Sequence, residues 1–458
     1  MDIDIKYQSS EKIMQQCEVF SLSDDTRSLK ENDIFIALPG EHFDGHQFIP
    51  DAIQKGAKGV IFQHRKLPEI RPYISRNPGV MFVGVKNTRR TLGEIARNYL
   101  KKFSLKKIVV TGSAGKTTTK NFIASVLSQK YNVLSSVQSF NNDIGVPKTV
   151  LGVTPRTEVL VQEFGTNHPG EIGWLSQIVG QDHAVITNIG PAHVGNFGSV
   201  EEIAREKKQA LPEHNQGKAF LNADDSFFSY LKSSTEAQVK SFGLTRGDLF
   251  PEEILEVGLD ESVFRVCGEQ IRVRPGGLHA IINATASVLV GIDFGLSMKE
   301  IKKGVETCTP QTGRGRVYHY NGATIIDETY NANPLSVNAA LELLGWLKVR
   351  GRKIFVFGDM LELGASSYYY HREICTGIMH NRINLLFTFG EQAEITAEAC
   401  AAKGCVTVKH FSCVENVAAE LKEILKQGDV VLIKGSRAVE LDRVVKELIK
   451  AGAETDRG

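Results

Sequence analysis

The segment "KKIVVTGSAGKTTTK", residues 106–120, decides the fold of the middle of the chain. Its β-branched start favours a strand, two glycines follow, and a lysine with three threonines opens a segment of helical composition. Glycines let backbone N–H groups approach a phosphate, and a helix N-terminus favours negative charge. Lys116 is then expected to reach the terminal phosphates of ATP, and Thr117 to ligate Mg²⁺. The predicted phosphate loop consists of Gly112, Ser113, Ala114, Gly115, Lys116, Thr117 and Thr118.

This loop is a shortened form of the usual phosphate-binding pattern. The template G-x-x-x-x-G-K-[ST] requires glycine at position 110, where the chain has Val110. The alternative interpretation is a glycine turn before a helix, with a solvated lysine. Because strand, loop and helix are all expected where the motif requires them, the sequence favours nucleotide binding.

Length and composition set the broad class of the protein. At ~150 residues per domain, 458 residues predict about three domains. The 54 basic and 53 acidic residues nearly balance, so no nucleic-acid partner and no anionic membrane surface is expected. The N-terminus has no apolar core of a signal peptide, and no apolar run reaches ~20 residues, so neither a leader nor membrane insertion is predicted. We therefore expect a cytoplasmic protein.

The seven cysteines contain no C-x-x-C pair, and we expect free thiols in a reducing cytoplasm. A zinc site made of Cys400, Cys405, His410 and Cys413 was considered as an alternative. Its spacing fits no common zinc ribbon, so free thiols remain the preferred interpretation.

Strand and helix patterns divide the chain into three α/β units, with boundaries after residues 103 and 309. Residues 1–103 predict a small α/β domain with a closing helix over 89–103. Residues 104–309 predict a parallel sheet of the P-loop ATPase type, and residues 310–458 a Rossmann-like doubly wound sheet. The expected strands are 32–38, 59–62, 106–112, 131–137, 157–165, 183–190, 218–225, 323–328, 353–358, 384–390 and 429–435, and a long helix is expected over 278–295.

Two polar residues are predicted at the carboxyl edge of the central sheet. Glu163 ends a strand expected beside the loop strand, and His193 follows another strand end. Ligands bind at this edge in open α/β folds, and a carboxylate there can hold Mg²⁺ together with Thr117. Each residue taken alone could be an ordinary turn residue, but their joint placement favours a site.

Stretches from all three units together resemble the Mur ligase family, whose members are ATP-dependent enzymes that form amide bonds in peptidoglycan synthesis. The phosphate loop is shared with folylpolyglutamate synthases, whereas "NHPGEI", "TYNANP" and "GDMLELG" in this order are more specific. The resemblance covers nearly the whole chain. It rests on residues 24–48 for a UDP-binding N-terminal domain, on 111–120, 139–147 and 161–175 for the central domain, and on 325–341, 355–364 and 431–442 for the C-terminal domain.

The resemblance implies a two-step ligation. The terminal carboxylate of a UDP-N-acetylmuramoyl-tripeptide attacks the γ-phosphate of ATP, and the amine of D-alanyl-D-alanine then displaces phosphate from the acyl phosphate. It also implies two Mg²⁺ ions and a carbamylated lysine, matched by Lys207, although the neighbouring Lys208 leaves the register open. The chain is expected to act as a monomer. The implied catalytic residues are Lys116, Glu163, His193 and Lys207, of which the last three, with Thr117, would be the metal ligands.

Further residues carry ligand assignments through the same resemblance. For ATP, the resemblance implies Asn283 at the adenine and Arg314 at the phosphates, with Arg316 as the alternative arginine. It implies Glu328 near the ribose, or Asp327 if the register shifts by one residue. For the UDP substrate they are Thr26, Arg27, Gly45 and His46, with Asn141 and Asn142 near the muramyl-peptide end. For the dipeptide they are Tyr330, Asn331 and Asn333, which could equally serve turn chemistry.

Two other functions were considered. One is another amide ligase of the superfamily, of the folylpolyglutamate or cyanophycin type, against which the UDP-like N-terminal stretch argues. The other is a P-loop switch or scaffold that binds nucleotide without ligating anything, and that would need neither Glu163 nor Lys207.

Overall fold

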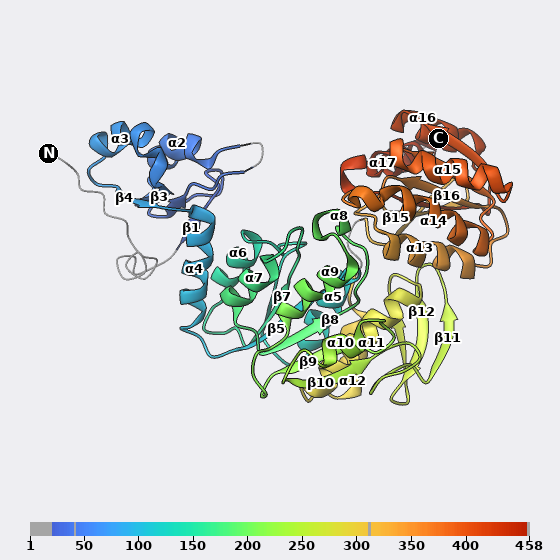
Figure 1. Ribbon diagram of the computed structural model, residues 1–458, viewed down its shortest axis with the longest axis horizontal. Helices are drawn as coiled ribbons and strands as arrows, with labels where there is room; N and C mark the ends of the chain where they lie inside the picture. The colour runs from blue at the N-terminus through green and yellow to red at the C-terminus, as the bar shows by residue number, and fades with distance from the viewer. Residues whose placement is uncertain (1–20, 41–42, 310–312, 456–458) are drawn as a thin grey trace. The chain divides into compact units, whose positions relative to one another are not determined.

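The computed structural model in Figure 1 describes residues 21–40, 43–309 and 313–455, with side chains to residue 450. The chain forms two compact units. The first unit consists of Met1–Leu105, Ser136–Thr157 and Trp174–Gly180, and the second of Lys106–Ser135, Glu158–Gly173 and Gln181–Gly458. Residues 1–20, which include Cys17 and the N-terminus on which the leader prediction rests, and the Pro310 side of the predicted boundary lie outside the described residues. No helix within the described ranges is both long and apolar enough to cross a bilayer.

The first unit is built on a four-stranded, fully parallel sheet in the order β1-β2-β3-β4. Alternate strand residues face opposite sides, as a period of two requires. Ile34 and Ile61 pack with Leu92 of α4, whereas Phe35 and Val60 belong to the core on the opposite face. The elements are β1 (Leu22–Ser23), β2 (Ile34–Ile36), η1 (Gly45–Phe48), α2 (Ile49–Gln54), β3 (Gly59–Gln63), η2 (His64–Lys66), α3 (Leu67–Arg76), β4 (Met81–Val85) and α4 (Thr88–Leu100).

A later segment completes this unit. Helix α6 (Gly145–Leu151) lies in Ser136–Thr157 and packs against α4. The Tyr99 hydroxyl donates to the Val153 carbonyl at 2.7 Å, and Lys148 pairs with Asp24 at 2.7 Å. The first unit is therefore discontinuous in sequence.

The second unit begins with a six-stranded sheet in the order β10-β9-β8-β5-β7-β6, and every pair in it is parallel. Strand β5, which leads into the phosphate loop, lies at its centre, and its residues 108–110 are fully buried. Helices α11 and α12 pack against α5. The elements are β5 (Lys106–Thr111), α5 (Lys116–Leu127), β6 (Val133–Ser135), β7 (Val159–Glu163), α7 (Glu171–Val179), β8 (His183–Ile186), α8 (Val194–Phe197), α9 (Val200–Lys207), η3 (Lys208–Ala210), β9 (Lys218–Asn222), α10 (Phe228–Lys232), β10 (Gln238–Phe242), α11 (Leu278–Asp293) and α12 (Met298–Glu306).

An antiparallel sheet of three strands was not predicted from the sequence. Its order is β11-β12-β13, with β11 (Glu253–Val257), β12 (Ser262–Val266) and β13 (Glu269–Val273). Strand β11 is mostly exposed, whereas Phe264 and Ile271 of the other two strands are buried in the same core as α11. A short edge strand of alternating charge carries little apolar signal, which explains why the sequence did not reveal it.

The C-terminal part of the second unit is a doubly wound sheet in the order β14-β15-β19-β16-β17-β18. Strand β14 is antiparallel to β15, and all other pairs are parallel. Adjacent residues such as Ile325 and Ile326 face different cores, one shared with α16 and α17 and the other with α13, α14 and α15. The elements are β14 (Arg316–Tyr320), β15 (Ala323–Glu328), α13 (Pro334–Trp346), β16 (Lys353–Gly358), η4 (Gly364–Ser366), α14 (Ser367–His380), β17 (Leu385–Phe389), α15 (Glu391–Lys403), β18 (Thr407–Phe411), α16 (Val414–Ile424), β19 (Val430–Lys434), η5 (Arg437–Val439) and α17 (Asp442–Thr455).

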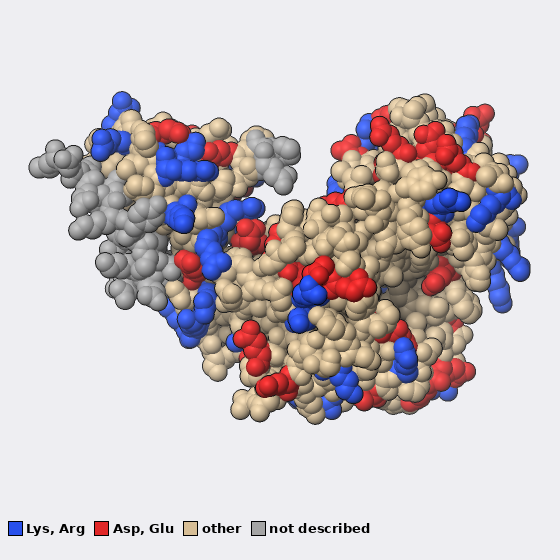
Figure 2. All heavy atoms as spheres, in the orientation of Figure 1, with Lys and Arg blue, Asp and Glu red and all other residues tan. Residues whose placement is uncertain are grey.

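The surface carries charges of both signs on each unit. On the face in Figure 2, lysine and arginine side chains are interspersed with acidic ones. This distribution agrees with the balance of 54 basic and 53 acidic residues.

Candidate active site

The phosphate loop connects the buried end of β5 to the first residue of α5, as the motif requires. Gly115 is the N-cap of α5 and has φ of +78°, a conformation that glycine adopts without strain. A Cβ at Gly115 would lie 2.7 Å from Oδ1 of Asn283, and a Cβ at Gly112 would lie 1.9 Å from Oγ1 of Thr187. Both glycines are therefore required by close neighbours as well as by the backbone.

Residues that follow strand β8 hold the loop in place. The Ala114 N–H donates to Oδ1 of Asn188 at 2.8 Å, and the Ser113 N–H donates to the Asn188 carbonyl at 3.0 Å. The Ser113 hydroxyl donates to the Gly190 carbonyl at 2.9 Å, and the Thr187 hydroxyl donates to the Ala114 carbonyl. The loop is thus preorganised by the "TNIG" segment, whose hydrogen-bonding role was not predicted from the sequence.

Lys116 is folded back over the loop. Its Nζ donates to the Gly112 carbonyl at 2.9 Å. Burial lowers the pKa of Lys116, the Glu163 carboxylate raises it, and the Arg314 guanidinium lowers it further. A half-buried cation with so few compensating anions is suited to receive a polyphosphate, which would stabilise its charged form.

Glu163 occupies the predicted position beside the loop strand. Glu163 is the last residue of β7, pairs in register with Val110 of β5, and is only 1% exposed. Thr117, on the first turn of α5, is equally buried. A hydroxyl and a carboxylate are oxygen donors of the kind that Mg²⁺ prefers, so this pair fits the implied ion.

Lys207 and Lys208 differ sharply in their surroundings. Lys207 is the last residue of α9 and is 2% exposed, whereas Lys208 is half-buried with its Nζ 5.5 Å from the ring centroid of Tyr230. Burial, with the nearby charge of Lys116, lowers the pKa of Lys207 well below its ordinary value. Glu206, the one anion that raises the pKa of Lys207, is itself engaged with the N–H groups of Gly170 and Ile172. Of the two lysines, Lys207 therefore has the environment in which the neutral amine is favoured.

His193 lies at the start of α8 in the left-handed conformation, with φ of +59°. Its Nδ1 forms an ion pair with the Glu362 carboxylate, and the Gly195 N–H donates to the Glu362 carbonyl at 3.0 Å. The histidine is thereby oriented by a residue of the "GDMLELG" loop. The sequence analysis quoted that loop but did not select Glu362, because the two segments are far apart in the chain.

Two of the residues assigned to the nucleotide line a small cavity. It is lined by Thr118 and Arg314, among others, and the Arg314 guanidinium lies 3.9 Å from the centroid of the Tyr330 ring. Arg316, its rival, is an exposed residue of β14 next to Tyr318. Of the two arginines, the structure places Arg314 beside the loop. The remaining lining residues are Asn121, Phe122, Arg274, Pro275, Cys308 and Thr309.

The two acidic residues at the end of β15 have different partners. Asp327 is buried and accepts from the N–H and the hydroxyl of Thr329, so it fixes the local turn. Glu328 instead lies 3.2 Å from Nζ of Lys434, and its charge raises the pKa of His279, which burial lowers. Glu328 is therefore the acid that borders the site.

Comparison with known proteins agrees with this geometry. Models of the Mur ligase middle domain, the Mur ligase glutamate ligase domain and the Mur ligase catalytic domain match residues 110–291, 285–437 and 20–100. UDP-N-acetylmuramoyl-tripeptide–D-alanyl-D-alanine ligase from Bacillus subtilis is 33% identical over 95% of this chain and 94% of its own length. The chain belongs to the Mur ligase family.

Solved structures resemble this Mur ligase over nearly its whole length. A crystal structure of MurF from Acinetobacter baumannii superposes with a TM-score of 0.85 at 28% identity, covering 97% of this chain and 99% of the other. MurF ligase from Thermotoga maritima in complex with ADP gives a TM-score of 0.82 at 28% identity, covering 95% and 98%. The predicted fold class, α/β with parallel sheets in a Mur ligase architecture, is confirmed.

The residues assigned to the dipeptide lie close to the phosphate loop. Asn333 caps α13, and its Nδ2 donates to the Ser113 carbonyl at 3.2 Å. The carbonyl of Asn331 accepts from Nζ of Lys434 at 3.0 Å, and Tyr330 lies against Arg314. Of these three residues, Asn333 both caps a helix and contacts the phosphate loop of this Mur ligase.

The residues assigned to the UDP substrate lie in the first unit. Arg27 is exposed and held by the Asp25 carboxylate at 2.7 Å, whereas His46 is buried and accepts from the Gln63 N–H at 2.9 Å. A Cβ at Gly45 would lie 2.7 Å from backbone atoms of Leu38, so this glycine is required by a close approach. Thr26 and Asn141 are half-buried, and Asn142 accepts from the Gly145 N–H at 2.9 Å and so orders the start of α6. Within this set, Arg27 presents the most exposed side chain to a ligand.

Proposed function

We propose that this chain is a UDP-N-acetylmuramoyl-tripeptide–D-alanyl-D-alanine ligase, which consumes ATP to produce the UDP-muramyl-pentapeptide. The observation that carries the proposal is the match to ligases of that name along nearly the whole chain, including 34% identity over 92% of the chain to the Treponema pallidum protein. The phosphate loop supplies the ATP chemistry, and the N-terminal and C-terminal parts supply the two substrate sites.

The reaction we propose begins with attack of the tripeptide carboxylate on the γ-phosphorus of ATP. An acyl phosphate forms and ADP leaves. The dipeptide amine then attacks the acyl carbon, phosphate leaves with the C–O electron pair, and the amine proton is lost. Lys116 and the loop N–H groups would neutralise charge on the phosphoryl group throughout, and positioning supplies most of the remaining rate.

We further propose that Thr117 and Glu163 hold one Mg²⁺ ion, and that His193 and Lys207 serve a second. When bound, Mg²⁺ would neutralise charge on the phosphate oxygens. Glu362 would orient His193 through the ion pair at Nδ1. The oxygen donors of Thr117 and Glu163, both buried at the loop, support this assignment.

Lys207 is proposed to act as a carbamate. A neutral amine reacts with carbon dioxide, R–NH₂ + CO₂ → R–NH–COO⁻ + H⁺, and converts a buried cation into an anionic oxygen ligand. An ordinary lysine, with a pKa of about 10.4, is almost entirely protonated at neutral pH. Burial of Lys207 beside Lys116 lowers its pKa and so favours the reactive form.

Substrate contacts complete the proposal. We assign Thr26, Arg27, Gly45 and His46 to the UDP end, Asn141 and Asn142 to the muramyl peptide, and Tyr330, Asn331 and Asn333 to the dipeptide. Asn283, Arg314 and Glu328 are assigned to the base, phosphates and ribose of ATP. We also propose that the enzyme is a cytoplasmic monomer with no nucleic-acid partner.

A coupled assay with product detection tests the function. Purified enzyme with Mg²⁺ and ATP should release ADP only when UDP-muramyl-tripeptide and D-alanyl-D-alanine are both present, and mass spectrometry should detect the pentapeptide. Tripeptides ending in diaminopimelate and in lysine are compared side by side. Absence of pentapeptide from every combination would refute the proposal.

The assay also separates the competing functions. A folylpolyglutamate-type ligase would release ADP with folate and glutamate instead. A nucleotide-dependent switch would hydrolyse ATP slowly, without any dependence on either substrate and without an amide product.

A further inference from the structure

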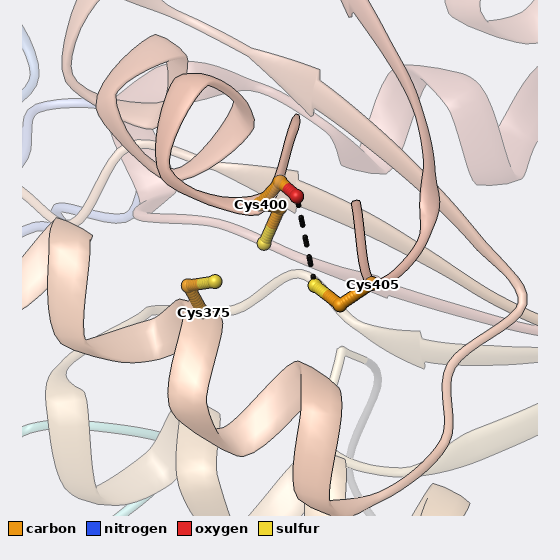
Figure 3. Close-up of side chains that lie close together, drawn as sticks. All are labelled: Cys375, Cys400 and Cys405. Carbon is orange, nitrogen blue, oxygen red and sulfur yellow. Dashed lines mark hydrogen bonds between the residues drawn. The ribbon is translucent and has the colours of Figure 1, made fainter. Parts of the chain in front are cut away.

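Three cysteine side chains meet inside the C-terminal sheet domain, away from the residues assigned to ligation. Cys375 comes from α14, Cys400 from α15, and Cys405 from the connection between α15 and β18. Their Sγ atoms all lie within 4.8 Å of one another. Figure 3 shows the three sulfurs directed toward a common centre, with the Cys405 thiol donating to the Cys400 carbonyl at 3.6 Å.

The spacing is close to that of a three-sulfur ligand set. Sulfurs bound to one ion at about 2.3 Å lie roughly 3.8 Å apart. The sulfurs would therefore have to approach one another by about 1 Å at most. Cys375 and Cys400 lie on helices that pack against each other, whereas Cys405 lies in the connection between α15 and β18, outside regular structure.

The three cysteines differ in how deeply they are buried. Cys405 is half-buried and offers an entry, whereas Cys375 and Cys400 are fully buried. The latter two lie in an apolar core that includes Ile374, Ile378 and Leu386. Among the residues that the structure describes, no fourth metal-ligating side chain joins the three thiols.

The net charge of the resulting complex distinguishes among the ions that could bind to the three thiols. Burial raises the pKa of the Cys400 and Cys405 thiols and so disfavours thiolates at these two positions. Three thiolates around a divalent cation would leave a net negative charge in an apolar core, which is unfavourable. Trivalent arsenic avoids this charge, because As(OH)₃ + 3 R–SH → As(SR)₃ + 3 H₂O forms three As–S bonds, breaks three As–O bonds and involves no redox step.

We propose that Cys375, Cys400 and Cys405 form a binding site for a trivalent metalloid of the arsenite and antimonite class. The site is independent of the ligase activity and of the residues assigned to it.

The test uses the full-length protein, reduced with a phosphine so that no competing thiol is present, and arsenite as the probe. Native mass spectrometry should show one arsenic per chain, with a mass gain of one arsenic atom less three hydrogens. The Cys405→Ser variant should bind roughly tenfold or more weakly, because one of three chelating arms is lost, and its complex should retain one hydroxyl on arsenic. The matched control is Cys267→Ser, which removes an exposed thiol outside the cluster and should leave both readouts unchanged.

Folding of each variant is checked by circular dichroism, and Cys375→Ala provides a second removal of one thiol. Absence of a one-to-one arsenic adduct would overturn the proposal. So would equal arsenite affinity in wild type and Cys405→Ser. Binding of Cd²⁺, detected by its thiolate charge-transfer absorption, with exclusion of arsenite would overturn the metalloid assignment.

Discussion

The two six-stranded sheets of the second unit differ in how the charged side chains at their carboxyl edges are compensated. At the edge of the C-terminal sheet, the buried Lys434 and the half-buried Asp359 both have partners. Lys434 binds Glu328 and the Asn331 carbonyl, and Asp359 accepts from the N–H groups of Gln392 and Ala393.

At the edge of the central sheet, Lys207 is buried and Lys116 is half-buried, and burial together with the charge of Lys116 lowers the pKa of Lys207. Two neighbouring cations with so little compensation are unfavourable for stability, yet they suit an edge that receives phosphate or becomes carbamylated. The comparison teaches that the C-terminal edge is electrostatically complete by itself, whereas the central edge is completed by ligands.

The largest effect is expected from Lys116→Met. Loss of the cation at the phosphates should lower kcat by about ten-thousand-fold, in line with the removal of a central electrostatic group. Because a partly desolvated, poorly compensated charge is removed, the thermal midpoint of the ligand-free protein should stay the same or rise. Steady-state kinetics and calorimetry measure the two effects, with Lys101→Met, an exposed lysine, as the control. A destabilised Lys116→Met protein would contradict the comparison.

Lys207→Ala should lower kcat by about a thousand-fold, and a short carboxylic acid should restore part of the activity by replacing the carbamate. The folded-state pKa of Lys207 lies below its unfolded value, so the unfolded chain binds more protons and Lys207 disfavours folding at neutral pH. The ligand-free Lys207→Met protein should therefore be no less stable than wild type. Lys208→Ala is the matched control, and an unimpaired Lys207→Ala enzyme would exclude the carbamate.

Lys434→Met should mainly lower the stability of the folded protein, in contrast to Lys116→Met and Lys207→Met. Removing one partner of a buried pair leaves Glu328 uncompensated, at a cost of about 3 kcal/mol in the free energy of unfolding. Urea unfolding measures the loss. Lys409→Met breaks the exposed pair with Glu420 and should change stability by less than ~1 kcal/mol. Equal effects of the two variants would show that the C-terminal edge is not held by its charges.

The smallest effect concerns His183, at the opposite, amino edge of the central sheet. Burial lowers its pKa from 6.5 to about 4, so the folded state disfavours the proton. Stability should fall as the pH drops from 6.5 toward 4, by about 2 kcal/mol after allowance for the half-buried ring. Urea unfolding at pH 7 and at pH 4.5 measures the free energy of unfolding. Between these two pH values, His183→Phe should lose about 2 kcal/mol less of this free energy than the wild-type protein. Identical pH slopes in the two proteins would remove His183 as the cause.

Much of the fold could be predicted because its signals are local. The ranges predicted for β15 and β16 coincide with the observed strands, since each is a buried run between clear breakers. Strand β18 was missed because its sequence, "TVKHF", alternates charge and apolar residues at a sheet edge.

The site could be predicted only where a contiguous motif carries it. Glu362 contacts His193 from more than 160 positions further along the chain, and no local pattern reports such a pair. The cysteines show the same limit. The zinc alternative combined Cys400 and Cys405 with His410 and Cys413, but His410 contacts Thr388 and Cys413 contacts Glu415. The third member of the cluster is Cys375, from another helix.

The discontinuous first unit has a consequence for synthesis and for engineering. Its Ser136–Thr157 and Trp174–Gly180 segments are translated after the phosphate loop of the other unit. The nascent first unit therefore lacks the Val153 partner of Tyr99 until the ribosome has passed that point. A chimaera joined at residue 103 would combine α4 from one parent with α6 from another, and a functional exchange must transfer all three segments together.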